Sequence, residues 1–236
     1  MAAVSAIRQP LAADERLPSG VGVGIGNLAG LAGLGFVGLV VAENVLRGGA
    51  PMGIVDAAAI SSYYVERRVP IAISQSMVVV ALPLLLIFAN AVFRRLRAGS
   101  GGDFWPGIGL GGAHVLAALF VLVSATDLAL NAIAGRVSGS PDVLIMLHAL
   151  HGAAFVFNMA VLGVTFGGFG LGAWQARSEP RWLAAIGIGG GALLLLGALP
   201  ALAVVEGSYW IGIGLVGFLG WLFWMVAMSI RMLRTS

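Results

Sequence analysis

Residues 70–93, PIAISQSMVVVALPLLLIFANAVF, contain no charged side chain and lie between two pairs of arginines, Arg67-Arg68 and Arg94-Arg95. About 20 apolar residues are enough for a helix to cross the hydrocarbon core of a bilayer. Backbone N–H and C=O groups must find partners within the chain there, and a helix pairs nearly all of them. The stretch therefore predicts a membrane-spanning helix flanked by arginines.

Five further apolar runs have a similar character, at about 21–46, 106–134, 142–175, 181–205 and 208–230. The composition agrees, because 59% of the residues are hydrophobic and only 10% are charged, whereas about a quarter are charged in a soluble domain. We predict an all-α integral membrane protein, a six-helix transmembrane bundle in one domain (21–236) after a polar segment (1–20). The run 142–175 is longer than a bilayer requires, so we expect it to tilt or to break in the glycine-rich stretch 163–172.

The arginines predict the orientation of the bundle. If the N-terminus is cytoplasmic, nine of the 13 basic residues lie inside and four outside, as the positive-inside rule requires. The densest group, Arg94-Arg95-Leu96-Arg97, directly follows the second run. We therefore expect both termini in the cytoplasm and the protein in a bacterial cytoplasmic (inner) membrane.

The one substantial loop, 47–69, contains its own helix signals. Asp56 is placed to cap a short helix that runs to Arg68, with Tyr63 and Tyr64 within it. We expect this segment to lie on the outer membrane surface with its tyrosines at headgroup level. Two arrangements are open there: a lid packed over the helix ends, or a docking segment.

The order of elements from Asp56 through Tyr63-Tyr64, Arg67-Arg68 and the apolar span to Arg94-Arg95-Leu96-Arg97 resembles a group of bacterial multi-pass membrane proteins. The resemblance covers about 45 residues and includes no catalytic motif. It implies a fold type and no activity.

Glycines recur at four-residue spacing, which allows helix backbones to approach closely. Such ladders occur at Gly22-Gly26-Gly30, Gly107-Gly111, Gly163-Gly167 and Gly187-Gly191. We expect them to pack the bundle internally. The ladder of the first run is an alternative contact for a homo-oligomer or for other membrane subunits.

Polar residues gather toward the outer ends of the predicted spans, where an ionisable group is costly and is a functional candidate by default. The strongest set is Asp127, His148 and His151. The two histidines are three residues apart and share a helix face, and a short loop makes the third and fourth spans antiparallel neighbours. A supporting polar cluster is expected from Glu43, Gln75, Asn131, Asn158 and Glu206.

These side chains allow three kinds of chemistry. Asp127, His148 and His151 could hold a divalent transition metal, or take part in a proton relay or ligand site, or tie helices together by hydrogen bonds. His114 lies at a different depth from His151, which disfavours a haem shared between them. The chain has no Cys for thiolate ligands and no Lys for a retinal Schiff base, and it contains no phosphate-binding loop or His-Glu-x-x-His motif.

The leading interpretation is therefore an outward-facing polar site between helices that binds a metal ion or a small polar ligand. Whether catalysis follows binding is open. The alternatives are a non-catalytic accessory or scaffold subunit of a larger membrane complex, and a small proton-linked transporter. The lipid bilayer is the expected surrounding, and scattered arginines at helix ends do not indicate nucleic-acid binding.

Overall fold

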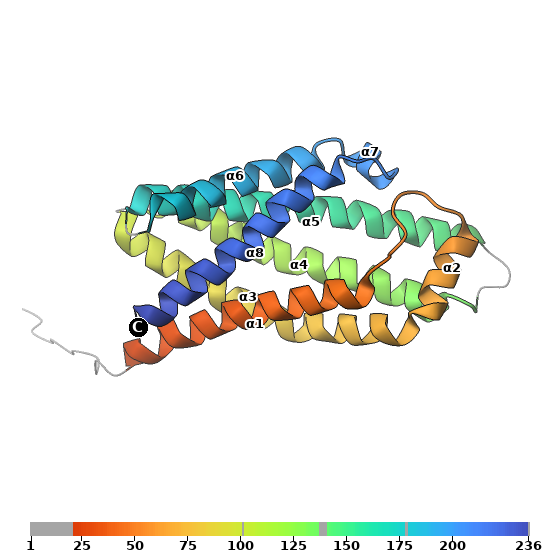
Figure 1. The fold of residues 1–236 in the computed structure, drawn as a ribbon, viewed down its shortest axis with the longest axis horizontal. Coiled ribbons are helices and arrows are strands. Elements are labelled where there is room, and N and C mark those ends of the chain that lie inside the picture. The colour runs from red at the N-terminus through yellow and green to blue at the C-terminus, as the bar shows by residue number, and fades with distance from the viewer. Residues whose placement is uncertain (1–20, 101, 137–140, 178, 236) are drawn as a thin grey trace, which may run out of the picture.

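The computed structural model describes residues 21–100, 102–136, 141–177 and 179–235, and the expected N-terminal segment 1–20 lies outside these residues. The described part of the chain is all-helical (Figure 1). Its helices are α1 (Val21–Arg47), α2 (Ala57–Glu66), α3 (Arg68–Ser100), α4 (Phe104–Ile133), α5 (Pro141–Ala176), α6 (Arg181–Ala198), α7 (Ala201–Val205) and α8 (Ile211–Arg234).

Six of the described helices are long and apolar enough to cross a membrane: α1, α3, α4, α5, α6 and α8. This confirms the predicted all-α bundle with six spanning helices and indicates a multi-pass membrane protein. Short connections make chain neighbours antiparallel, so the bundle has two ends (Figure 1). One carries α2 and α7, and the other carries the C-terminus.

The structure removes one alternative for the fourth run and corrects the bounds of the fifth. α5 does not break in its glycine-rich stretch but continues unbroken for 36 residues, about 54 Å at 1.5 Å per residue. The run 181–205 is instead interrupted, because α6 ends at Ala198 and α7 starts after Pro200. Proline has no backbone N–H and its ring clashes with the preceding turn, so a helix tends to stop there.

The glycines of α5 explain why that helix stays intact. They give room to neighbouring helices rather than bending the backbone: a Cβ atom added at Gly170 would lie 2.6 Å from the backbone carbon of Gly187 in α6. On the other side of α5, a Cβ at Gly168 would lie 2.6 Å from the backbone nitrogen of Gly109 in α4. α5 therefore packs closely between α4 and α6.

The main apolar core includes buried side chains from all six long helices. Trp224 of α8 is 1% exposed and packs against the rings of Phe88, Phe166 and Phe169. α8 crosses the bundle diagonally and contacts both α1 and α6 (Figure 1).

The glycine ladders differ in their surroundings. A Cβ at Gly30 would lie 2.8 Å from the Ser229 carbonyl oxygen, so this end of the first ladder packs internally against α8. The surroundings of Gly22 lie outside what the structure describes. Gly107 and Gly111 have no such neighbour within 4 Å among the described residues, so α4 presents them outward.

Candidate functional site

α2 packs as a lid over the ends of the spanning helices. The Asp56 side chain accepts a hydrogen bond of 2.7 Å from the Ala59 backbone N–H, so the predicted N-cap is confirmed. Tyr63 is partly buried and Tyr64 is buried, and both hydroxyls reach into the bundle. Of the two arrangements predicted for this segment, the lid is the one found.

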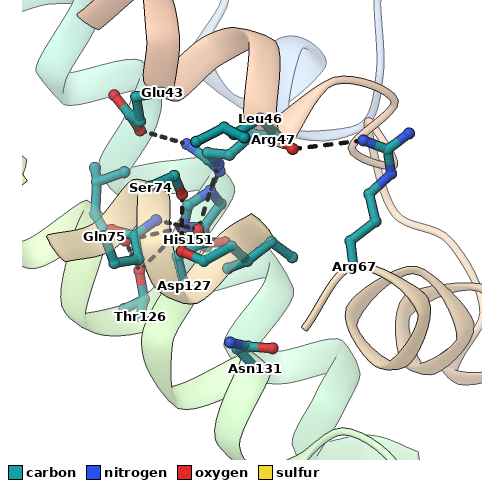
Figure 2. A network of polar contacts seen from close by, with 12 residues as sticks. Glu43, Leu46, Arg47, Arg67, Ser74, Gln75, Thr126, Asp127, Asn131 and His151 are labelled. Atoms are coloured by element: carbon teal, nitrogen blue, oxygen red, sulfur yellow. Dashed lines mark hydrogen bonds and ion pairs between the residues drawn. The ribbon is translucent and has the colours of Figure 1, made fainter. Parts of the chain in front are cut away.

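Arg47, the last residue of α1, lies at the centre of the polar network beneath this lid (Figure 2). Its guanidinium lies 3.3 Å from Asp127 Oδ2, 3.4 Å from Glu43 Oε1 and 3.1 Å from His151 Nε2. The Arg47 carbonyl accepts a 2.6 Å hydrogen bond from the Tyr63 hydroxyl. One side chain thus joins α1 to α4 and α5.

Asp127 is fully buried and uses both carboxylate oxygens (Figure 2). The Tyr64 hydroxyl donates to Oδ1 and the Gln75 amide donates to Oδ2, each at 2.5 Å. Burial and the adjacent Asp127 carboxylate raise the pKa of Tyr64 well above its usual range. The phenol therefore stays protonated and continues to donate to Asp127.

His151 faces Arg47 on one side and α4 on the other. A guanidinium can only donate, so Nε2 is the accepting nitrogen and the proton of the neutral ring is on Nδ1. Nδ1 lies 3.2 Å from the Val123 carbonyl and 3.1 Å from the Thr126 hydroxyl, both of which can accept. This arrangement fixes the tautomer of His151.

His148 has a different partner from His151. Its Nε2 lies 2.9 Å from the Gly53 carbonyl, which can only accept, so Nε2 carries the proton and Nδ1 is the acceptor. Nδ1 is buried and has no hydrogen-bond partner among the described residues. A buried acceptor without a partner costs free energy unless a ligand or water satisfies it.

The three residues of the metal hypothesis meet at the same end of the bundle, but not as a ligand set. Arg47 contacts both Asp127 and His151, while His148 is directed to the 48–53 loop. Within the described ranges, no three His, Cys, Asp or Glu side chains are grouped so that they could hold a metal ion.

A pocket of about 330 Å³ lies beside this network, between α1, α5, the 48–53 loop and the start of α8. Its polar side is lined by Asn44, Arg47, His148 and His151, and the lining found in the described residues contains no carboxylate. Its remaining wall is largely apolar and includes Phe155, Val205 and Ile211.

The loop over this pocket is held by two glycines. Gly53 and Gly207 have φ angles of 78° and 95°, in a region that favours glycine. A Cβ at Gly53 would lie 2.8 Å from the Gly207 Cα. This close contact between the two glycines fixes the loop, whose Gly53 carbonyl lies 2.9 Å from His148 Nε2.

The supporting residues divide into two groups. Glu43 and Gln75 join the network, and Asn131 lies next to it, donating to the Arg68 carbonyl at 3.1 Å. Asn158 is buried elsewhere in α5, and its Oδ1 has no partner among the described residues. Glu206 is an exposed residue at the end of α7. His114 is exposed on α4.

Sequence reasoning missed Arg47, Tyr64 and Thr126 as members of this site. Arg47 was counted only as an orientation charge. Two signals could have identified it: its position four residues after Glu43 on one helix, and the need of a span carboxylate such as Asp127 for a countercharge.

The fold and site together define a multi-pass helical membrane protein with a buried ion-pair network beneath a polar pocket. No protein-family model, curated protein or solved structure matches the chain. The resemblance over residues 56–97 therefore stays a prediction.

Proposed function

We propose that the protein binds a small amphipathic molecule in the pocket beneath the 48–53 loop, with the polar head of that molecule at Arg47 and His148. One observation carries this proposal: His148, whose Nδ1 is buried and has no partner among the described residues, belongs to the lining of a pocket that also includes Arg47. A polar, roomy site with an unsatisfied acceptor is suited to a ligand.

The chemistry of the lining indicates the type of head. Arg47 supplies donors only, and His148 Nδ1 is an acceptor. Asp127 already balances the charge of Arg47 at 3.3 Å, so a further full charge is not required. A neutral head that both donates and accepts, such as an amide or hydroxyl, satisfies both sides, and Phe155, Val205 and Ile211 receive an apolar body.

The same contacts favour this ligand over a metal ion. A metal at this site would need His148 Nε2, His151 Nε2 or the Asp127 oxygens, and each of these already has a partner in the protein. His148 Nδ1 alone would be a single ligand, which is fewer than transition-metal sites use.

The proposed orientation places this pocket on the outer side of a bacterial inner membrane, with both termini in the cytoplasm. Among the described residues, the end opposite α2 carries seven arginines and two carboxylates, and the α2 end carries four arginines and six carboxylates. The excess of arginine supports a cytoplasmic location for the end opposite α2.

Binding is tested by native mass spectrometry of the purified full chain with three probes of one shape: benzamide, benzoate and benzylamine. Benzamide should bind best, and His148→Leu should weaken it about tenfold, since losing a buried hydrogen bond costs about 1–1.5 kcal/mol. The matched control His114→Leu, at an exposed histidine, should bind as the wild type does. Preferential binding of benzoate or benzylamine, or unchanged binding in His148→Leu, would contradict the proposal.

A second function, as a subunit of a larger membrane assembly, is favoured by the outward face of α4. His114 is exposed there beside the open positions Gly107 and Gly111, and an imidazole facing hydrocarbon is costly. Disulfide crosslinking of Gly111→Cys in membranes tests self-association, since the chain has no other cysteine. A covalent dimer supports a homo-oligomer, and its absence at full oxidation argues against self-association through this face.

A further inference from the structure

The bundle end opposite α2 carries a strong excess of positive charge. Seven arginines and two carboxylates lie there in the described residues: Arg94, Arg95, Arg97, Asp103, Arg177, Glu179, Arg181, Arg231 and Arg234. Five positive charges are therefore unbalanced at one end of a bundle whose spans are apolar.

The buried carboxylate at this end is already saturated. Glu179, in the α5–α6 connection, accepts from Arg95 Nε at 2.5 Å and from Arg231 Nε at 2.6 Å, and its side chain is 0% exposed. Arg95 also donates to the Thr235 hydroxyl at 2.8 Å. Two arginines therefore share the single negative charge of Glu179. This carboxylate does not neutralise a third arginine.

A groove of about 680 Å³ adjoins this ion-pair group of Arg95, Glu179 and Arg231. Its lining includes Trp174, Arg177 and Arg181, together with Glu179. The Arg181 guanidinium lies 5.8 Å from the centre of the Trp174 ring. No carboxylate among the described residues forms an ion pair with Arg177 or Arg181.

We propose that this groove binds the phosphate of an anionic phospholipid headgroup through Arg177 and Arg181. Guanidinium groups bind phosphate oxygens with paired hydrogen bonds, and both arginines are exposed. Basic pockets at helix ends are suited to lipid phosphates.

Position favours a membrane lipid over free phosphate. The groove lies at the junction of two spanning helices, α5 and α6, at the level where headgroups meet the hydrocarbon. Trp174 is 52% exposed and Trp182 is 49% exposed at this level, and indole rings prefer the membrane interface. Trp174 and the two arginines give the groove an apolar and a cationic part, as a phospholipid requires.

The test is native mass spectrometry of the full chain in detergent, titrated with phosphatidylglycerol and, separately, with phosphatidylcholine. The variant Arg177→Gln/Arg181→Gln should lose phosphatidylglycerol affinity about tenfold or more, because it removes both guanidinium groups that would bind the phosphate. The matched control Arg94→Gln/Arg234→Gln removes the same charge from two exposed arginines at the same end and should change the affinity less than about twofold, because neither arginine lines the groove.

Three outcomes would overturn the proposal: equal losses in both double variants, no preference of the wild type for phosphatidylglycerol, or displacement of the lipid by millimolar inorganic phosphate. The last result would indicate a site for free phosphate. The single variants Arg177→Gln and Arg181→Gln provide the same comparison should the double variant not fold, and each should lose part of the affinity.

Discussion

At the scale of single residues, Arg47 connects the features of the α2 end. A buried carboxylate in an apolar span is stable only with a partner, and Asp127 receives three: a guanidinium, a phenol and an amide. The same guanidinium fixes the tautomer of His151 and lines the pocket. Packing, charge balance and the proposed binding site therefore depend on one side chain.

The Arg47–Asp127 pair should show strong energetic coupling. Asp127→Asn leaves the Arg47 charge without its main partner and should lower the free energy of unfolding by about 3 kcal/mol. Adding Arg47→Gln to Asp127→Asn should cost much less than Arg47→Gln alone, because no unpaired charge remains. Chemical unfolding in detergent of the wild type, both single variants and the double variant measures this coupling. Additive effects would show that the two side chains do not interact.

Tyr64 should make stability depend on alkaline pH. Burial raises its folded-state pKa above the value near 10 of an unfolded chain. The unfolded chain then loses the phenolic proton first, so the stabilising contribution is full below about pH 10 and declines as the pH rises further. Melting temperatures between pH 8 and 11 should fall more steeply for the wild type than for Tyr64→Phe. Parallel curves would contradict a protonated Tyr64 in the folded state.

At the scale of secondary-structure elements, close helix contacts depend on particular glycines. α5 stays straight enough to pack between α4 and α6 because Gly168 and Gly170 let the neighbouring backbones approach. The ladder on α4 is different, since Gly107 and Gly111 have open space around them. Glycines therefore occur both at close helix contacts and on an open helix face.

Alanine substitutions should separate these two kinds of glycine. Gly170→Ala would place a methyl group 2.6 Å from α6 backbone and should destabilise the protein by about 1–3 kcal/mol through overpacking. Gly107→Ala meets nothing within 4 Å and should be neutral or stabilising by up to about 1 kcal/mol, from helix propensity. Thermal unfolding in detergent compares the two. A larger loss in Gly107→Ala would contradict the described packing of α4.

Most elements could be predicted from the sequence, and the exceptions have physical causes. Apolar runs and the Asp56 cap are local signals, and both are found. The interruption at Pro200 was overlooked because the residues on both sides of it are equally apolar. The role of Arg47 depends on contacts with α4 and α5 that lie 80 and 104 residues away in the chain, and no local pattern reports such contacts.

At the scale of the whole molecule, charge is divided between the two ends of the bundle. The α2 end has more carboxylates than arginines, and the opposite end has the reverse. This division supports the proposed orientation, and it assigns the two sites to different environments. The polar pocket lies at the α2 end of the bundle. The proposed lipid site lies at the opposite, arginine-rich end.

The orientation should be visible in reporter fusions. Fusions after Arg97 and after Arg177 should report the cytoplasm, and a fusion near Ala58 should report the outside, because the positive-inside rule places the arginine-rich end inward. The reverse pattern would place the pocket on the cytoplasmic side.

Access of water to the pocket beneath the 48–53 loop is the most direct measure of the central claim. The chain has no cysteine, so Gly152→Cys introduces a single thiol into the pocket lining, where a Cβ would meet only Val205 at 3.9 Å. The control Leu219→Cys lies on the exposed apolar face of α8. A charged methanethiosulfonate avoids hydrocarbon, so in membranes it should modify Gly152→Cys about tenfold faster or more. Equal, slow modification of both variants would contradict a polar pocket at this position.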